Sequence, residues 1–490
     1  MTDTEGLLQL HNGQYILSTE LSEKMSIIKS VHPEERPLDS TGFSWDEAGM
    51  ADLFGMTYSH DTRYCPQFKS WYTYADGKWQ HDSGNLLVAG KIKEFVRLMW
   101  LYCGEIADEE KRTAYEKLIS KMGDRRFRDR ITKDAEEVLR IDSREFDSHP
   151  NLINCLNGTY DLATMTFREH RWQDFLTFQT NFEYTWQETS CPRWEQFIAE
   201  VTCNDAEKAD YLQRALGYSL LGDAREECMF ILYGKTTRNG KSTMLGTIHH
   251  LLGDYATVSP VSIICKADRS KNADSASPTL AALKGKRVVT MAESNQYGRL
   301  DEEMIKQLTG GEEISARRLY QEQSTFLPQF TLWLSCNDLP AVQDKSLFAS
   351  DRVRVIEFTR HFSEDERDET LKEVFRTPEA MMGIFSWLLD GYRKYRTKRL
   401  KMCDTMKAVI RKYEADNDLV LTFLEESCNH SDGTIKAKQL YDQYKMWARS
   451  NGYFVLSAKK FYSGVEQHPA WGERKLRDGY PVFCGISLKN

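Results

Sequence analysis

Apolar and polar residues follow a strand-like pattern in some parts of the chain and a helical pattern in others. Between residues 229 and 365, short apolar runs alternate with helical patterns, and the runs cover 229–233, 287–291, 330–334 and 353–356. Strands that alternate with helices are typical of a mostly parallel sheet covered by helices. The pattern therefore predicts an α/β core in this part of the chain.

The segments before this core change between strand and helix patterns. Residues 46–90 are rich in aromatic and turn-forming residues and predict short strands, whereas 88–142 predict helices. Strands return at 151–168, where Asn157-Gly158 lies between two apolar runs and is typical of a hairpin turn. A helix follows from residue 192. Its apolar face carries Trp194, Phe197, Ile198 and Val201.

The end of the chain predicts a small unit similar to a winged helix. Residues 434–486 follow the order helix, helix and two-stranded wing, with Ser457 placed to cap the second helix and Asp478-Gly479 placed to turn the wing. Lys459 and Lys460 on the second helix are candidate DNA contacts. Residues 413–490 hold ten basic and ten acidic residues, so docking of another protein stays open.

These patterns divide the chain into five parts. They are an α+β region at 1–148, a hairpin and helical region at 149–225, an α/β core at 226–390, a basic helical connector at 391–412 and the winged-helix-like unit at 413–490.

Composition narrows the class of protein. The chain has 490 residues, of which 41% are hydrophobic and 28% charged, and this is typical of a folded protein. No apolar run approaches the roughly 18–20 residues that cross a bilayer, and the acidic start is unlike a secretory signal. The eleven cysteines form no Cys-x-x-Cys pair, which favours free thiols in a reducing compartment. We expect a protein of the cytoplasm, in a bacterial host, without a membrane partner.

The net charge of −8 conceals one strongly basic stretch. The chain has 65 basic and 73 acidic residues, yet residues 391–412 hold nine basic residues and one acid. A nucleic acid responds to such a local concentration of charge rather than to the total. A solvated helix face is the equally simple alternative.

The most informative segment follows the apolar run 229–233. It reads Gly234-Lys-Thr-Thr-Arg-Asn-Gly240-Lys241-Ser242-Thr243 and precedes a helical pattern. A strand, a glycine-containing loop with Lys-Ser and a helix form the context of a P-loop. We expect Gly234, Asn239, Gly240 and Thr243 to shape the nucleotide site, Lys241 to neutralise phosphates and Ser242 to bind Mg²⁺.

One feature departs from the strict P-loop pattern. The first glycine is expected at position 235, where this chain has Lys235, and the glycine stands one place earlier at Gly234. Either the loop is one residue longer, or another residue adopts the turn.

Further candidates lie at the ends of later strands, because open α/β sheets bind ligands at their carboxyl edge. Glu293 follows one strand and is placed to polarise water or bind Mg²⁺, although Ala292 excludes a pair of acids. Asn337 follows the next strand and is placed to orient the attacking water. Arg352 and Arg354 flank the last strand and are candidate arginine fingers, with surface salt bridges as the alternative.

The order of four motifs resembles superfamily 3 helicases of the phage, plasmid and poxvirus primase–helicase type. The motifs are Gly240-Lys-Ser-Thr, Val288-Val-Thr-Met-Ala-Glu293, Lys306-Gln-Leu-Thr-Gly-Gly311 with Ser315-Ala-Arg-Arg-Leu-Tyr320, and Leu334-Ser-Cys-Asn337-Asp-Leu-Pro340. The resemblance covers about 150–365, with weaker likeness on both sides.

The resemblance implies an AAA+-like fold, a ring that is usually a hexamer, ATP bound with Mg²⁺ between subunits, and movement 3′ to 5′ on one DNA strand. It implies that Lys241 and Ser242 bind nucleotide and Mg²⁺, that Glu293 is the Walker B acid and that Asn337 is sensor 1. The family usually has two arginines before its last strand, where this chain has Asp351-Arg352, so the resemblance supplies one arginine of that pair.

The segment Ile314–Phe326 corresponds to the family's pore hairpin. Arg317 and Arg318 can meet phosphates and Tyr320 offers a stacking face, which is the usual chemistry of single-strand binding. A salt bridge to a nearby glutamate and a core tyrosine form the alternative. Lys306, which precedes this segment, is a further candidate DNA contact.

The sequence therefore predicts an ATP-dependent DNA helicase in the replication of a mobile element. Its expected partners are single-stranded or forked DNA, further copies of the chain, and a primase or polymerase. A P-loop ATPase that loads or remodels replication proteins is one alternative, and a DNA-binding initiator without unwinding activity is another.

Overall fold

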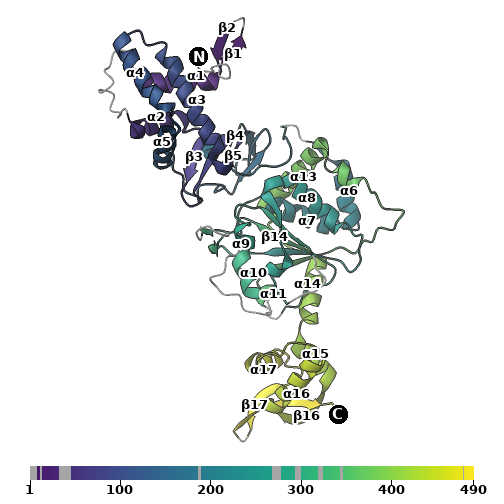
Figure 1. Cartoon of the computed structure of the whole chain (residues 1–490). Coiled ribbons are helices and arrows are strands. Elements are labelled where there is room, and N and C mark those ends of the chain that lie inside the picture. The colour runs from purple at the N-terminus through teal and green to yellow at the C-terminus, as the bar shows by residue number, and fades with distance from the viewer. Residues whose placement is uncertain are drawn as a thin grey trace. The chain divides into compact units, whose positions relative to one another are not determined.

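The computed structural model describes residues 8–11, 14–31, 46–185, 189–266, 278–292, 299–317, 324–342, 346–477 and 479–489. It divides into two compact units (Figure 1). The first comprises residues 1–338 and 352–403, and the second comprises 339–351 and 404–490.

A five-stranded parallel sheet forms the centre of the first unit. Its order is β10-β11-β14-β9-β15. The strands are β9 (Met229–Tyr233), β10 (Ala256–Val258), β11 (Val288–Ala292), β14 (Thr331–Cys336) and β15 (Val353–Glu357). The predicted α/β core is confirmed, since buried parallel strands read as continuous apolar runs. The short edge strand β10 was not predicted.

The first unit also contains helices that come before, between and after these strands in the sequence. They are α6 (Pro192–Val201), α7 (Ala206–Tyr218), α8 (Lys241–Leu252), α9 (Pro278–Ala281), α10 (Glu302–Thr309), α12 (Leu371–Val374) and α13 (Pro378–Lys398). The four apolar residues predicted on one face of α6 are all buried. A short hairpin of β12 (Ile314–Ala316) and β13 (Ser324–Phe326) lies between α10 and β14 in the sequence.

An antiparallel meander precedes these helices. It consists of β6 (Leu152–Cys155), β7 (Gly158–Asp161) and β8 (Thr166–Arg168). The predicted hairpin is confirmed, but its turn lies one residue earlier than expected, because Gly158 already pairs with Cys155.

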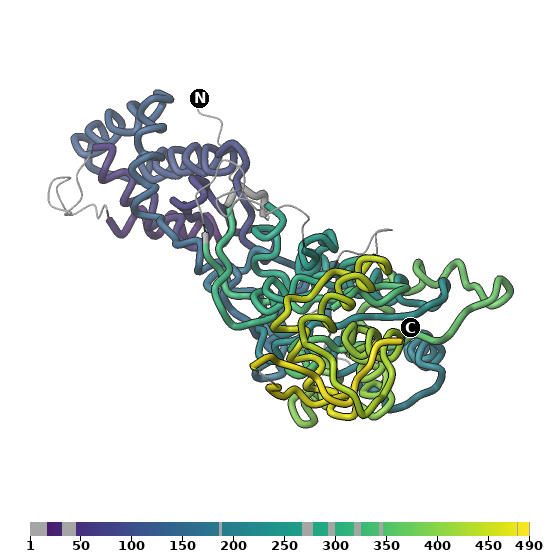
Figure 2. Tube along the Cα trace, turned by 90° about the horizontal axis from the view of Figure 1, so that it is seen from below, coloured from purple at the N-terminus to yellow at the C-terminus, as the bar shows by residue number. Residues whose placement is uncertain are grey.

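The N-terminal part contains more helix than the sequence predicts. It comprises β1 (Leu8–His11), β2 (Gln14–Leu17), α1 (Thr19–Val31), α2 (Glu47–Tyr58), β3 (Thr62–Cys65), β4 (Ser70–Ala75), β5 (Lys78–His81), α3 (Leu86–Cys103), α4 (Glu109–Met122) and α5 (Arg125–Val138). Figure 2 shows the helices among these gathered together. The prediction of strands is wrong for 47–58. Asp46 caps that helix, and its residues are buried on most sides, so they show no helical period.

The second unit has a mixed order of helices and strands. It comprises α11 (Ser346–Ala349), α14 (Asp404–Asp416), α15 (Leu419–Ser427), β16 (Cys428–Lys436), α16 (Ala437–Ser450), α17 (Ala458–Glu466), β17 (Glu473–Arg477) and β18 (Tyr480–Leu488). The predicted helix cap is confirmed, since Ser457 Oγ accepts from the amide of Lys460 at 3.4 Å. The predicted wing turn also lies between paired residues, Arg477 and Tyr480.

The basic stretch 391–412 is not one connector. Its first part is the end of α13, and its second part lies in α14, which the contacts assign to the other unit. The structural boundary therefore falls inside the predicted connector.

A membrane-spanning helix would need a long, apolar element. No helix among the described residues has that combination.

Candidate nucleotide site

The predicted P-loop joins the central strand of the sheet to a helix. The strand β9 lies between β14 and β15, and α8 begins at Lys241 directly after the loop. Gly240 has a φ of +86°, and a Cβ there would lie 2.4 Å from a methyl carbon of Val201. Only glycine fits this position, and α8 begins directly after it, so the amino end of a helix lies at the loop, where helices commonly bind anions.

The displaced glycine has a clear physical reason. A Cβ at Gly234 would lie 2.5 Å from the carbonyl oxygen of Phe358 and 2.7 Å from Asn239 Nδ2. Gly234 is therefore the point of close approach, which makes the loop one residue longer than the strict pattern. Arg238 also adopts a positive φ of 56°, so a second residue contributes to the turn. Both alternatives left open by the sequence have a part.

The Lys241 side chain is buried at the carboxyl edge of the sheet. It is only 4% exposed, and its ammonium donates to the carbonyl oxygen of Gly234 and to Asn337 Oδ1, each at 3.1 Å. A buried ammonium needs acceptors to offset its lost hydration. The fold thus places the predicted phosphate-neutralising lysine beside the predicted sensor asparagine, which comes from the end of a different strand.

The remaining loop residues divide between the two sides of the loop. Asn239 is 4% exposed, and its Nδ2 donates to the carbonyl oxygen of Thr236 at 2.5 Å, so it holds the loop rather than facing a ligand. Ser242 is exposed and lines one pocket, whereas Gly240 and Thr243 line another. Pockets therefore lie on both sides of the loop.

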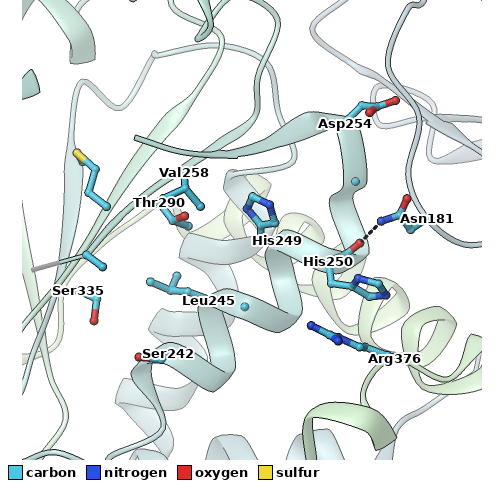
Figure 3. Close-up of a pocket in the computed structure, with 14 residues that line it drawn as sticks. Asn181, Ser242, Leu245, His249, His250, Asp254, Val258, Thr290, Ser335 and Arg376 are labelled. Carbon is cyan, nitrogen blue, oxygen red and sulfur yellow. Dashed lines mark hydrogen bonds between the residues drawn. The ribbon is translucent and has the colours of Figure 1, made fainter. Parts of the chain in front are cut away.

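The pocket beside Ser242 has a volume of about 590 Å³ and runs along α8 (Figure 3). Figure 3 shows Ser242 and Leu245 on the helix, with Thr290 and Ser335 from the ends of the strands opposite. Hydroxyl groups and backbone amides at this edge suit phosphate and hydrated Mg²⁺. The residues present fit a nucleotide with its metal ion, with the Ser242 hydroxyl as the metal-facing group.

Two histidines line the far part of this pocket. Burial lowers the pKa of His249 and of His250, and the nearby cations Lys286 and Arg376 lower them further. Both effects favour the neutral imidazole. Asn181 fixes this end of the pocket by donating to the carbonyl oxygen of His250 at 2.8 Å.

The predicted acid Glu293 lies outside the described residues. The strand before it is described up to Ala292, which lines the pocket. Among the described residues, no group of three or more His, Cys, Asp or Glu side chains is placed to hold a metal ion.

The two candidate finger arginines differ in their surroundings. Arg354 is 7% exposed, donates to the carbonyl oxygen of Leu400 at 2.5 Å and pairs with Glu226 at 3.6 Å. This placement speaks against a finger, which must reach a neighbouring nucleotide. Arg352 instead lies at the amino end of β15, where it pairs with Glu227 and donates to Thr309 Oγ1 at 3.0 Å.

The candidate DNA contacts are described only in part. Arg317 is exposed at the end of β12, and Lys306 is half-buried in α10. Lys459 and Lys460 are exposed in the first turn of α17. Arg318 and Tyr320 lie outside the described residues.

The sequence did not reveal the segment that follows β15 and holds the P-loop. His361 Nδ1 lies 2.8 Å from the carbonyl oxygen of Thr237. The amide of Phe362 donates to the carbonyl oxygen of Arg238 at 2.9 Å. Arg238 also pairs with Glu364 at 3.2 Å. The sequence did not identify Glu364 as a contact of the loop, because its partner Arg238 is far away in the sequence.

The strand order and the loop define an α/β protein with a P-loop type of strand–loop–helix unit. Comparisons with known families extend this. Residues 50–203 match the family described as "D5 N terminal like", residues 232–352 match a family of unknown function, and residues 415–481 match the family described as "Poxvirus D5 protein-like".

Several viral proteins are similar to the chain. "Putative helicase L207/L206" of Acanthamoeba polyphaga mimivirus is 25% identical over 428 residues, which are 79% of this chain and 44% of that protein. "Putative helicase 121R" of Invertebrate iridescent virus 3 is 24% identical over 61% of this chain and 35% of that protein. "Putative primase C962R" of African swine fever virus (strain Badajoz 1971 Vero-adapted) is 20% identical over 74% and 41%.

The chain therefore carries D5-type regions and fits the primase–helicase family that its motifs resemble. It spans less than half of the length of these viral relatives. Among solved structures, the C-terminal region of NrS-1 in its apo form is similar to this chain. The match covers 90% of this chain and 98% of the NrS-1 chain, with 11% sequence identity and a TM-score of 0.48.

Proposed function

We propose that the chain is an ATP-dependent DNA helicase that forms a ring and moves along one strand, 3′ to 5′, during replication of a virus, phage, plasmid or other mobile element. The observation that carries this proposal is the Lys241 ammonium, buried between Gly234 and Asn337 at the carboxyl edge of the parallel sheet. The viral relatives named as helicases and primases support it.

Each residue of the site has a separate task in this proposal. The amides after Gly240 bind the phosphates, and Lys241 neutralises the charge that develops on the leaving phosphate oxygens. Asn337 orients the attacking water, since its side chain already lies beside Lys241. Bound Mg²⁺ would neutralise further phosphate charge, with Ser242 and Glu293 as the residues that hold it.

A ring would complete the site. Arg352 lies at the end of β15 opposite to the P-loop edge, because β15 and β9 run parallel and the loop follows β9. In a head-to-tail ring, that opposite edge is placed to face a neighbouring nucleotide. Arg352 is therefore our candidate finger, and its contacts to Glu227 and Thr309 hold it until a neighbour arrives.

DNA would meet two parts of the chain. The β12–β13 hairpin, with Arg317 and the adjoining Arg318 and Tyr320, would line the pore, and Lys306 would support it from α10. The second unit, which follows the order helix, strand, helix, helix, strand, strand from α15 to β18, is proposed to be winged-helix-like. Its exposed Lys459 and Lys460 would contact DNA backbone phosphates.

The test combines ATP hydrolysis with unwinding of a forked DNA. We expect the wild type to hydrolyse ATP faster with single-stranded DNA and to separate the fork, and we expect Lys241→Ala to do neither. A wild type that hydrolyses ATP without separating strands would refute the helicase and favour the loading ATPase. A wild type without ATP hydrolysis above Lys241→Ala would favour the initiator.

A second variant separates the pore from the nucleotide site. Arg317→Ala removes one exposed cation from the hairpin and leaves the loop untouched. We expect it to lose unwinding and DNA stimulation while keeping basal ATP hydrolysis. Unchanged unwinding would remove the pore assignment.

A further inference from the structure

The two-stranded wing of the second unit exposes apolar side chains. All five residues of β17 are exposed, and Leu476 and Tyr480 are 78% and 63% exposed. In Figure 1 the pair extends away from the helices of its unit. Neither side chain belongs to the described core of this unit, so both are open to solvent or to a partner.

The register places three cations on the same face of the wing as Tyr480. Residues directly opposite each other in paired strands project to the same side, and so do residues two apart. Arg477 lies opposite Tyr480, and both Lys475 and Lys436 lie opposite Val482, two residues further along β18. Lys436, Lys475, Arg477 and Tyr480 therefore share one face, which we call the wing face.

The described contacts leave these groups accessible. Lys436 Nζ lies 5.5 Å from the centre of the Tyr480 ring. Lys475 pairs with Glu473 at 2.7 Å, but the two side chains are 54% and 72% exposed, so water screens this pair and a phosphate can compete for the lysine. Val482 and Glu473 also lie on the wing face, where Val482 is buried. On the opposite face, Ile435 and Phe483 belong to the core of the unit, whereas Leu476 is exposed.

An exposed aromatic ring among cations suits an unpaired nucleotide. The ring offers a stacking surface to any base, and the cations meet the backbone phosphates. A protein partner fits less well, because lysine is depleted at the centre of protein interfaces.

We propose that the wing face binds single-stranded DNA, with a base stacked on Tyr480 and phosphates at Lys436, Lys475 and Arg477. This contact is separate from the hairpin of the motor and from Lys459 and Lys460. It rests on the proposed function only in taking DNA as the partner.

The test measures DNA binding by the full chain without nucleotide, by fluorescence anisotropy. The probes are a thymidine homopolymer and a blunt duplex of equal length. We expect Tyr480→Ala to weaken binding of the single strand about 5- to 10-fold, because base stacking on an aromatic ring is lost. Binding of the duplex should change less than about twofold, because its bases stay stacked.

Three further variants sharpen the test. Tyr480→Phe keeps the ring and should keep the affinity. Tyr453→Ala removes a 43% exposed tyrosine elsewhere in the same unit and should change nothing. Arg477→Ala should reduce the slope of log K against log salt by about 0.7 for the single strand, whereas Tyr480→Ala should leave that slope unchanged.

Equal affinities of the wild type and Tyr480→Ala for the single strand overturn the proposal, as does equal weakening for single strand and duplex. These outcomes are distinct from failure of the proposed function. A chain that binds DNA through the wing face but never hydrolyses ATP would refute the helicase and leave this inference intact.

Discussion

The carboxyl edge of the sheet and the basic stretch 391–412 distribute positive charge in opposite ways. At the sheet edge, one lysine is 4% exposed and points at two oxygen acceptors. The stretch 391–412 has nine cations, but they divide between α13, the turn after it and α14, and several are neutralised by the protein itself. Lys394 and Lys398 both pair with Asp210, at 3.3 and 3.6 Å. The number of charges in a segment therefore identifies a site less well than the burial of a single cation and the acceptors that it contacts.

The largest expected effect comes from the buried lysine. Lys241→Ala should lower the ATPase rate by about 10²- to 10³-fold, because it removes a preorganised cation at the phosphates. Lys235→Ala is the matched control, since Lys235 is exposed in the same loop. Steady-state phosphate release measures both. Equal losses of ATPase rate in the two variants would show that the buried lysine matters no more than the exposed one, and would contradict this prediction.

The buried arginine of β15 should act on stability instead. Arg354→Ala removes the ion-pair partner of Glu226, which keeps its hydrogen bond from Tyr395, and the donor to the carbonyl oxygen of Leu400. Loss of one partner of a buried pair costs about 3–5 kcal/mol. Urea unfolding should show this loss. Arg352→Ala, the matched control, should cost less than about 1 kcal/mol while lowering ATP hydrolysis, and the opposite result would return the finger to Arg354.

These two arginines show what a sequence can and cannot reveal. Four of the five strands of the core sheet were predicted, because burial on both faces produces continuous apolar runs, whereas the short edge strand β10 was not predicted. The P-loop was predicted from its order, and its glycines lie where close approach requires them. The burial of Arg354 gave no sequence signal, because a cation in a strand looks the same whether its partner is solvent or Glu226. The helix α2 was missed for a related reason, since burial on most sides removes its period.

Loss of the amide beside Lys241 should have a smaller effect on rate. Asn337→Ala removes the acceptor at 3.1 Å from Lys241 Nζ and the group that we propose to orient water. We expect kcat to fall about 10- to 10²-fold through misplacement, with little change in KM for ATP. A rise in KM without a fall in kcat would show that Asn337 holds the nucleotide rather than the water.

The smallest effects should come from the basic stretch. Lys394→Ala removes one exposed cation from Asp210 and should cost about 0.2–1 kcal/mol of unfolding free energy. Lys401→Ala is the control, since Lys401 has no ion pair within the described part of the chain and should change stability by less. A loss of unfolding free energy above about 2 kcal/mol would show that the ion pairs in this stretch behave like buried ion pairs.

The same pair predicts how stability depends on pH. Burial alone would raise the pKa of Asp210, but hydrogen bonds from Arg214 and Lys394 outweigh it, and the pKa lies below its ordinary value of 3.8. A carboxyl with a lowered folded-state pKa stabilises the protein above its unfolded pKa, and that contribution disappears as the pH falls through the folded value. The difference in Tm between wild type and Asp210→Asn should therefore be constant from pH 7 to about 5 and shrink below about 4. A difference that grows on acidification would show that the carboxyl is destabilised in the folded state, and Asp210 would then not be the group that neutralises this stretch.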